Sequence, residues 1–361
     1  MLHDATFMWV KMVITVPGIL WLASLTLTYY EFLSFKYSRS ASNDLSVASG
    51  HSVISLRALL KKLLQDFSGG RVQVDVRMVS RNLVMGTSVQ AALGLTTLMK
   101  AGDLCMPSLS EGVAAIEAEF RRSGTAEDIE CFEYVAKERA GSSRTVFSNG
   151  NLMRDCDANG RVLENRLNRD GLGMTLDEFV RHPSSTTAGL KTAEVLALRL
   201  YTTAAFKSLN NPLRDTSEDR PPHPFPCTVN YIRDAIGKLR AVEAANGDLG
   251  MVDLWRGMKN VKALSDFLEH GGTELAPMST TGDLKIALEY ALGAEALLLK
   301  VRTKSFMQRG ASLSYLSAFP AESEILYPPL TYLKPTGRTM EVHGDGTGAQ
   351  VVIVEVEPFQ G

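Results

Sequence analysis

The sequence predicts an α+β protein, and the pattern is clearest in its carboxyl-terminal half. Residues 190–209 and 229–245 carry apolar side chains at helical spacing. Beyond Gly250 the apolar runs become short and strand-like. Helices first and strands later are typical of an α+β domain rather than of alternating βαβ units. We therefore expect a helical part at 171–250 followed by a β core at 251–361.

Each element of this half has a local sequence signal. Thr175 and Glu178 have the spacing of a capping box, which predicts the start of a helix. Prolines within 220–226 break the chain between the two longer helices. A further helix is expected at 284–292. Strands are expected at four short apolar segments: 253–257, 297–302, 324–327 and 351–356.

The amino-terminal region resembles nothing that we can name. Residues 12–30 contain no charged side chain, and a run of roughly 20 apolar residues can cross a bilayer. Trp and Tyr near the ends of this run favour a membrane interface, so we expect a single-pass anchor, with the side of the remaining chain undetermined. A buried core helix is the alternative, and a cleavable signal peptide fits poorly. Residues 1–52 are thus predicted to be an anchor with a Ser-rich linker, and 53–170 an unassigned mixed α/β region.

The charge and the cysteine content argue against several classes of function. With 38 basic and 40 acidic residues the formal net charge is −2, so no overall positive field attracts nucleic acid. The four cysteines show no C-x-x-C spacing, which argues against a zinc site. They are too few for a disulfide scaffold, and their redox state stays open. We expect neither a nucleic-acid partner nor a metal.

One acidic segment imitates the first half of a calcium-binding loop. Asp155, Asp157 and Asn159 occupy the first ligand positions, and Gly160 occupies the turn position. The twelfth position, which should supply a bidentate glutamate, is Arg166. A cation there repels Ca²⁺, and Asp and Asn are also common in ordinary turns. We therefore interpret this segment as a turn.

Two polar motifs lie in the expected β core. Arg256 ends an expected strand and is followed by Gly257, an arrangement that suits a bidentate clamp on phosphate. A solvated or surface-paired arginine is the alternative. Ser279, Thr280 and Thr281 carry hydroxyls that can hydrogen-bond a ribose or orient a carboxylate. Capping of the helix that follows them is the alternative.

A third motif holds two carboxylates. On an extended segment, side chains at i and i+2 share one face, so we expect Glu322 and Glu324 to lie about 6–7 Å apart. Two carboxylates that crowd one site raise the pKa of at least one of them and permit divided roles in acid–base chemistry. An exposed acidic strand edge is the alternative.

Together and in this order, the three motifs resemble the arginine–serine–glutamate class of mono-ADP-ribosyltransferases. The similarity covers roughly residues 171–358, and the absence of a G-x-G-x-x-G motif agrees with a family unrelated to the Rossmann fold. Thr281 departs from the serine of the family pattern but keeps a hydroxyl. The matching segments are Trp255-Arg256-Gly257, Ser279-Thr280-Thr281, Glu322-Ser323-Glu324, and Tyr201-Thr202 with Asn210 and Arg214.

This resemblance implies a two-sheet β core around a cleft that binds NAD⁺ as co-substrate. Arg256 would grip the pyrophosphate, with Gly257 and Thr280 beside the dinucleotide. Ser279 would orient Glu324, which would accept a hydrogen bond from the 2′-hydroxyl of the nicotinamide ribose. The carboxylate would favour the positive charge that develops on that ribose as nicotinamide leaves.

The resemblance also assigns the acceptor side of the reaction. Glu322 would orient the guanidinium of an acceptor arginine and take its proton, because the family uses glutamate at this position for arginine acceptors. Phe319 would contact the acceptor, and Tyr290 would stack on nicotinamide. The implied activity is transfer of ADP-ribose from NAD⁺ to arginine side chains of proteins.

Two other functions fit the same residues. An NAD⁺ glycohydrolase would use the same site without a protein acceptor. A non-catalytic, membrane-tethered binding module would keep only the fold, and the presence of the arginine, the serine and both glutamates argues against it. Transfer to arginine is the leading hypothesis, and the identity of the acceptor protein is open.

Overall fold

The computed structural model divides the chain into two units. The first spans Met1–Leu59 and the second spans Leu60–Gly361. In the first unit the described part is an antiparallel hairpin of β1 (Ser46–Ser49) and β2 (Ser52–Ser55). The residues that the structure describes are 46–49, 52–55, 85–86, 111–142, 154–157, 159–215, 217, 219–245, 251–259, 261, 263, 265–292, 296–343 and 350–360.

The membrane anchor predicted from the sequence requires correction. No helix within the described ranges is long and apolar enough to cross a bilayer. Residues 12–30, where the anchor is expected, lie outside those ranges. The predicted single-pass anchor is therefore not supported.

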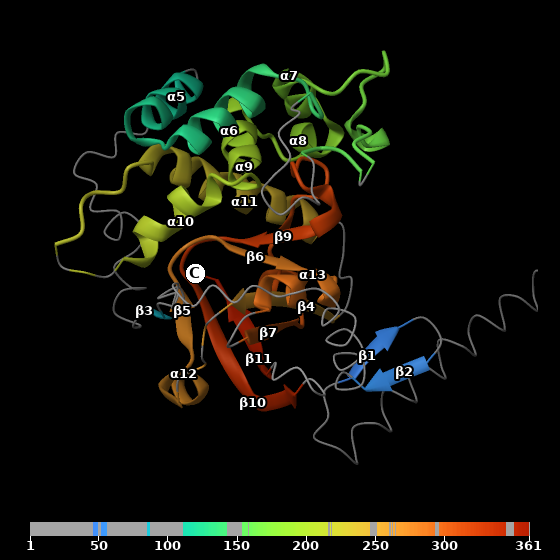
Figure 1. Ribbon diagram of the computed structural model, residues 1–361, viewed down its shortest axis with the longest axis vertical. Helices are drawn as coiled ribbons and strands as arrows, with labels where there is room; N and C mark the ends of the chain where they lie inside the picture. The colour runs from blue at the N-terminus through green and yellow to red at the C-terminus, as the bar shows by residue number, and fades with distance from the viewer. Residues whose placement is uncertain are drawn as a thin grey trace, which may run out of the picture. The chain divides into compact units, whose positions relative to one another are not determined.

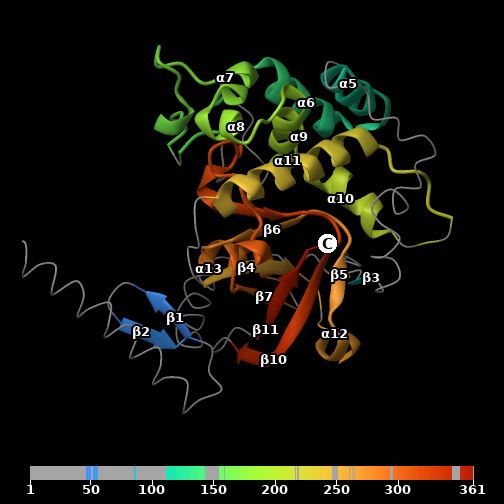
Figure 2. The ribbon, with the colours of Figure 1, turned by 180° about the vertical axis from the view of Figure 1, so that it is seen from behind.

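A helical layer forms the first part of the second unit (Figures 1 and 2). Helix α9 is its centre, because every residue from Ala193 to Tyr201 is buried. Helices α5, α6, α7 and α11 each contact α9. The helices of this layer are α5 (Gly112–Ser123), α6 (Ala126–Lys137), α7 (Leu176–Val180), α8 (Pro183–Thr187), α9 (Thr192–Tyr201), α10 (Phe206–Arg214) and α11 (Pro226–Ala245), with the short 3₁₀ helix η2 (Glu164–Arg166).

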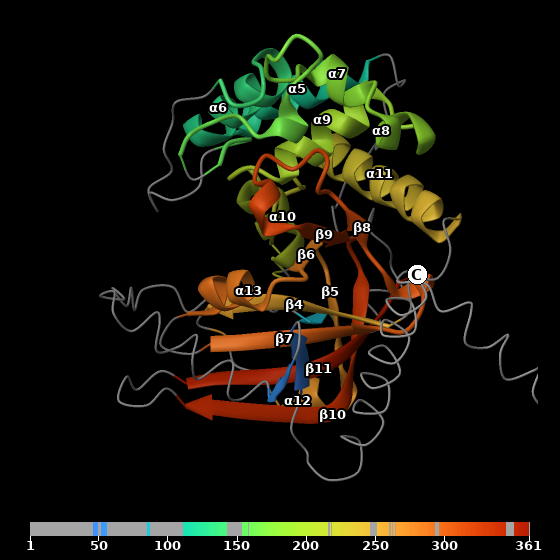
Figure 3. The same ribbon diagram turned by 90° about the vertical axis from the view of Figure 1, so that its right-hand side faces the viewer.

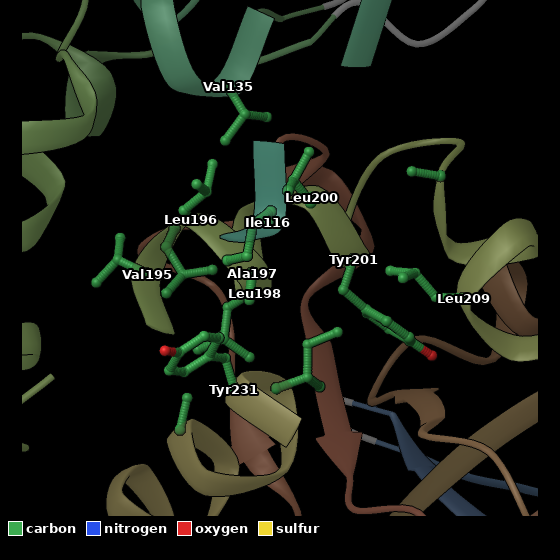
Figure 4. Packing of buried hydrophobic residues seen from close by; sticks show 14 of the residues in the cluster. Ile116, Val135, Val195, Leu196, Ala197, Leu198, Leu200, Tyr201, Leu209 and Tyr231 are labelled. Atoms are coloured by element: carbon green, nitrogen blue, oxygen red, sulfur yellow. The ribbon is translucent and has the colours of Figure 1, made fainter. Parts of the chain in front are cut away.

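The hydrophobic core of this layer extends upstream of residue 171. Ile116 of α5 and Val135 of α6 point toward the apolar side chains of α9, and Tyr231 of α11 approaches from another side (Figure 4). All three are buried in the same cluster. The part of the helical layer that the structure describes therefore begins at Gly112.

Two capping boxes define helix starts in this layer. The Thr125 side chain accepts a hydrogen bond from Asp128 N, and the Asp128 side chain accepts one from Thr125 N at the start of α6. Thr175 and Glu178 make the same pair of bonds at the start of α7. The start of a helix at Thr175, predicted from the sequence, is thus found in the structure.

The single helix expected over 190–209 is two helices, α9 and α10. Thr202 Oγ1 donates to the Arg199 carbonyl oxygen (2.8 Å), and Thr203 Oγ1 donates to that of Leu200 (2.6 Å). Hydroxyls that bond the preceding turn compete with the regular helical pattern. The helix breaks at this point, and both threonines border a cavity.

The second part of this unit is a sheet, of which the described residues form nine strands. Its hydrogen-bonded order is β3-β5-β10-β11-β7-β4-β6-β9-β8. β7 and β11 run parallel, and the other neighbouring pairs are antiparallel. The elements are β3 (Met85–Gly86), β4 (Val252–Lys259), α12 (Ser265–His270), β5 (Gly272–Glu274), β6 (Met278–Thr281), α13 (Leu284–Ala291), β7 (Ala296–Thr303), η3 (Phe306–Gln308), β8 (Ala311–Ser312), η4 (Pro320–Glu322), β9 (Glu324–Tyr327), β10 (Thr331–His343) and β11 (Gln350–Phe359). The predicted α+β fold is confirmed.

The sheet has two parts that meet at one residue pair. β4 pairs with β7 along its whole length, but it pairs with β6 only through Trp255 and Thr281. Strands β6, β9 and β8 lie nearer to the helical layer than β7, β11 and β10 do (Figure 3). Ala311 and Leu326 of these nearer strands are buried in the helical core, and α13 packs against β4. The two sheets implied by the resemblance are thus two parts of one hydrogen-bonded sheet, joined between β4 and β6.

Candidate functional site

A cavity of about 390 Å³ lies where the helical layer meets the junction of the two sheet parts. Tyr201 of α9 and Asn210 and Arg214 of α10 line it from the helical layer. Strands β4 and β6, helix α13 and the segment before β9 supply the remaining walls. The cavity brings together all eight site residues predicted from the sequence: Arg256, Gly257, Ser279, Thr280, Tyr290, Phe319, Glu322 and Glu324.

Arg256 belongs to a buried ion network at the cavity wall. Glu274 of β5 accepts two hydrogen bonds from Arg214, through Nε (2.9 Å) and Nη2 (3.1 Å). The same carboxylate lies 3.4 Å from Arg256 Nη2, and Arg256 Nη1 donates to the Ser279 carbonyl oxygen (2.9 Å). One carboxylate therefore holds two guanidinium groups, which leaves an excess of positive charge at this wall.

Two buried polar atoms at this wall have no hydrogen-bond partner within the described part of the chain. They are the donor Arg256 Nε and the acceptor Asn210 Oδ1. Burial lowers the pKa of Arg256, and the Glu274 carboxylate opposes that shift. Unpaired buried donors and acceptors are costly. A ligand with an anionic group and an N–H donor would satisfy both.

Glu324 is the first residue of β9, and the ladder to β6 sets its position. It pairs with Thr281, and Thr280 Oγ1 also joins the two strands by donating to the Ile325 carbonyl oxygen (2.9 Å). Burial raises the pKa of Glu324 to about 8, and the charge of Glu322 adds to the shift. A hydrogen bond with the Ser279 side chain and the nearby Arg256 charge act in the opposite direction. Glu324 is a fixed, buried carboxyl with weakened acidity.

Glu322 reaches the cavity by a backbone route that differs from the expected extended strand. It ends the 3₁₀ helix η4, and Ser323 then adopts a left-handed conformation with φ 46° before β9 begins. The Tyr290 hydroxyl donates to Glu322 Oε1 (2.5 Å). Burial raises the pKa of Glu322, whereas the Tyr290 hydrogen bond lowers it and the Glu289 charge raises it further. The turn, not an extended segment, brings the two carboxylates to one cavity.

The alternative role of the hydroxyl motif, capping of the following helix, is filled by a different residue in the structure. Asp283 caps α13 by accepting a hydrogen bond from Lys285 N (2.8 Å). Thr281 Oγ1 accepts a hydrogen bond from Asp283 N (3.0 Å) and so supports that cap. The Ser279 and Thr280 side chains instead contact Glu324 and β9, respectively.

Gly257 serves helix packing in addition to lining the cavity. A Cβ at this position would lie 1.7 Å from the Ala287 carbonyl oxygen of α13 and 2.9 Å from Ala291 N. No side chain fits at such distances. The glycine therefore permits the close approach of α13 to β4, and this contact explains it without reference to a ligand.

Glu274 is the site residue that sequence reasoning missed. It lies in β5, within a short run that leads to the hydroxyl motif, and its side chain is 2 % exposed. An isolated acid directly before the apolar Leu275 and Ala276 was a usable signal, because a buried carboxylate needs a cationic partner. The partners could not be predicted, since Arg214 is 60 residues away and Arg256 is 18 residues away.

In the segment that imitates a calcium loop, the side chains of two of the expected calcium ligands bond to other groups of the same segment. Arg166, at the twelfth position, donates through Nε to Asp155 Oδ1, at the first position (3.0 Å). Asp157 Oδ1 accepts hydrogen bonds from Asn159 N and Arg161 N (both 2.9 Å), as in an Asx turn. Among the described residues, no group of His, Cys, Asp and Glu is arranged to hold a metal ion.

Comparison with known proteins adds structural likenesses of low identity. No family model and no curated protein matches the chain. It is similar to HopU1 of Pseudomonas syringae, with 16 % identity over 64 % of this chain and 97 % of that one and a TM-score of 0.38. It is similar to the toxin Plx2a of Paenibacillus larvae, with 17 % identity over 51 % of this chain and 95 % of that one and a TM-score of 0.36. It is also similar to eucaryotic ART2.2, with 12 % identity over 72 % of this chain and 89 % of that one and a TM-score of 0.42. Each of the three is an ADP-ribosyltransferase. Likenesses at such identities and TM-scores carry no argument about the chemistry of the site, which is argued from the geometry of the site itself.

Replacement of Glu274 by Gln is expected to destabilise the fold by about 3–5 kcal/mol. The neutral side chain would leave Arg214 and Arg256, whose side chains are 9 % and 15 % exposed, without their shared counter-charge. Unfolding in urea, followed by circular dichroism, measures the change. Glu269→Gln on α12 is the matched control, because that side chain is 76 % exposed. Equal stability of the two variants would contradict the role of Glu274.

Proposed function

We propose that this protein transfers ADP-ribose from NAD⁺ to arginine side chains of acceptor proteins and releases nicotinamide. One observation carries the proposal: a single cavity contains Arg256, a Glu324 carboxyl in contact with Ser279, and a second carboxylate, Glu322. These groups come from β4, β6, β9 and the turn before β9. Together they suit a reaction that needs a cation to bind the pyrophosphate (Arg256), a fixed negative charge beside the ribose (Glu324) and a general base for the acceptor (Glu322).

The wall around Arg256 fits NAD⁺. The pyrophosphate is an anion, and Arg256 offers a buried Nε–H that has no partner in the described structure. Arg214 adds a second positive charge beside it. Asn210 Oδ1, an acceptor without a partner among the described residues, suits an amide or amino group, which both ends of NAD⁺ carry. These features support the assignment of Arg256 as the pyrophosphate clamp, the role that the resemblance implies.

Glu324 acts where positive charge develops. The bond between ribose C1′ and the nicotinamide nitrogen breaks, the electron pair leaves with nicotinamide, and the ribose becomes cationic. A carboxylate held by Ser279 and by the β6–β9 ladder needs no reorganisation to stabilise that charge. Glu324 must be ionised for this role.

Glu322 acts on the acceptor. An arginine guanidinium is protonated at neutral pH and has to lose a proton as its nitrogen bonds to C1′. Burial raises the pKa of Glu322, which makes its carboxylate a stronger base, and the Tyr290 hydroxyl holds it in place. Tyr290 therefore supports the base, a role different from the stacking that the resemblance implies. Phe319, at the amino end of η4, lies on the acceptor side of the cavity wall.

The proposal is tested with the full-length chain, labelled NAD⁺ and agmatine as an arginine mimic. Labelled agmatine would establish transfer to a guanidinium group. Free ADP-ribose without labelled agmatine would show a glycohydrolase instead. A folded protein that forms neither product and binds no NAD⁺ would refute an enzymatic function.

The rate of NAD⁺ hydrolysis is expected to depend on ionisation of Glu324. Since burial raises the pKa of Glu324 to about 8 and the ionised form is the active one, kcat/KM should rise about tenfold per pH unit below that value and level off above it. Removal of the Glu322 charge by Glu322→Gln should move the midpoint to lower pH, because that charge raises the pKa. Glu269→Gln should leave the midpoint in place. A profile that is flat between pH 6 and 9 would contradict this prediction.

We also propose that the functional unit includes α5 and α6 in addition to residues 171–361. Ile116, Phe120 and Phe132 of these helices are buried in the core that supports α9. Helix α9 ends at Tyr201, which lines the cavity and donates through its hydroxyl to the Pro277 carbonyl oxygen (3.0 Å). Helices α5 and α6 thus support the part of the cavity wall that the end of α9 supplies.

A further inference from the structure

Two buried arginines hold the chain that leads to Glu322. Residues 314–318, named here the loop stem, come directly before Phe319 and η4. Arg166 Nη2 donates to the carbonyl oxygens of Ser314 (2.7 Å) and Ser317 (3.0 Å). Arg199 Nη1 donates to that of Leu316 (2.7 Å). The position of the loop stem therefore depends on two guanidinium groups of the helical layer.

Asp155 joins these two arginines. Its carboxylate accepts hydrogen bonds from Arg166 Nε (3.0 Å), Arg199 Nη2 (2.9 Å) and the hydroxyl of Tyr134. Its backbone N–H donates to the Ala318 carbonyl oxygen (2.7 Å), at the end of the loop stem. Asp155 has φ 54°, a left-handed conformation that aspartate tolerates better than most residues do. The side chains of the cluster therefore bond to one another, and the cluster also bonds to the backbone of the loop stem.

The geometry of the cluster leaves little freedom. The side chains of Asp155 and Arg166 are 0 % exposed and that of Arg199 is 3 % exposed. A guanidinium is planar and donates in fixed directions, so a lysine cannot reach the same set of acceptors. Thr202 Oγ1 completes the hold by accepting a hydrogen bond from Ala318 N (2.9 Å). Five hydrogen-bonding groups of the stem backbone thus have partners outside the loop.

A short path connects the loop stem to the base. Ser317 Oγ accepts a hydrogen bond from Phe319 N (3.1 Å), and the 3₁₀ turn that follows is closed by the bond from Glu322 N to the Phe319 carbonyl oxygen (3.0 Å). Glu324 has a separate support, because its place depends on the β6–β9 ladder. Displacement of the stem should therefore move Glu322 more than Glu324.

We propose that Asp155, Arg166 and Arg199 are positioning residues. They place Glu322 where it can take the proton of the acceptor guanidinium as that group attacks ribose C1′, and so they determine the partition between transfer to arginine and hydrolysis. This inference rests on the proposed function, since it assigns Glu322 to the acceptor and Glu324 to NAD⁺ cleavage. None of the three residues lines the cavity in the described structure. The segment 154–166 thereby acquires a role in the reaction without touching a substrate.

The test compares full-length variants in two activities. Arg166→Lys keeps a positive charge, but its single nitrogen cannot span Asp155 on one side and the Ser314 and Ser317 carbonyl oxygens on the other. The ratio of agmatine transfer to NAD⁺ hydrolysis should fall about tenfold or more, with a raised KM for agmatine, because small displacements of a reacting group have large effects on rate. Thr202→Val should lower the ratio less, and Thr202→Ser should restore it, since serine keeps the hydroxyl.

Glu119→Gln is the control for loss of stability alone. Glu119 is also buried in the helical layer, where it caps α11 by accepting hydrogen bonds from Cys227 N and Thr228 N, far from the loop stem in sequence. The control should change both activities in parallel, with the ratio unchanged. Hydrogen exchange adds a readout that does not depend on activity: amides 316–319 should exchange faster in Arg166→Lys and Thr202→Val, and not in Glu119→Gln.

The outcomes separate this inference from the proposed function. A parallel loss of both activities in Arg166→Lys and Thr202→Val, or an unchanged ratio, would overturn the positioning role. If Arg166→Lys does not fold, the Thr202 pair decides. Because Thr202 also borders the cavity, a lower ratio in Thr202→Val supports the role only together with faster exchange at amides 316–319, and a lower ratio without it overturns the role. If the wild type forms neither product, the proposed function fails, and the role in partition fails with it even where exchange at amides 316–319 shows that the cluster holds the stem.

Discussion

Glu324→Gln is expected to reduce both NAD⁺ hydrolysis and transfer to agmatine by about 10³-fold. The amide has nearly the same shape and can keep the contact with Ser279, but it carries no negative charge where the ribose becomes cationic. Binding of NAD⁺ should persist, because the guanidinium groups of Arg256 and Arg214 remain. Release of nicotinamide, measured by chromatography, and a separate binding titration with NAD⁺ distinguish the two effects.

The fold of this variant should be intact. Burial opposes ionisation of Glu324, so a neutral amide costs less at this buried position than the carboxylate does. Thermal unfolding of Glu324→Gln, with Glu269→Gln as the control, checks this. Hydrolysis within tenfold of the wild type at pH 9, where Glu324 is ionised, would show that its charge is not required.

Glu322→Gln is expected to separate the two activities. Transfer to agmatine should fall by about 10²–10³-fold, because general-base catalysis contributes effects of this size and a guanidinium cannot react while it holds its proton. Hydrolysis of NAD⁺ should change only a few fold, since water needs much less assistance from a base. The measurement is the yield of labelled agmatine and of free ADP-ribose in the same reaction.

A milder variant tests the support of the base. Tyr290→Phe removes the hydroxyl that donates to Glu322 Oε1 and should lower transfer several fold with hydrolysis unchanged. Tyr290 is 52 % exposed, so the substitution should leave stability nearly unchanged. Agmatine labelling by Glu322→Gln at the wild-type rate would refute the division of roles between the two glutamates.

The polar residues of the site could be recognised from local spacing. An arginine before a glycine, a run of three hydroxyl residues and a Glu-x-Glu pair are short patterns, so the sequence alone marked Arg256, Ser279, Glu322 and Glu324 as candidates, and all four line the cavity. The α+β order was readable for the same reason, because the period of apolar residues changes along the chain. The start of α7 followed from the Thr175–Glu178 capping box.

Other features depend on partners that are remote in the sequence. Glu274 acquires its role from two arginines, and the loop stem is held by Arg166 and Arg199 from 117 to 151 residues away. The left-handed Ser323 overrides the extended conformation expected between the glutamates. Such features depend on burial and on tertiary hydrogen bonds, for which local propensity carries no signal.

The amino-acid sequence alone thus specified the order of helices and strands and the candidate polar groups of the site, since both depend on neighbours within a few residues. Only the tertiary structure decided which of these groups meet in one cavity, how far the pKa of Glu324 rises, and which arginines face a carboxylate. The reason is that desolvation and charge pairing depend on the packing of distant segments. In this chain the helical layer supplies that packing for a site whose recognisable motifs lie mostly in the sheet.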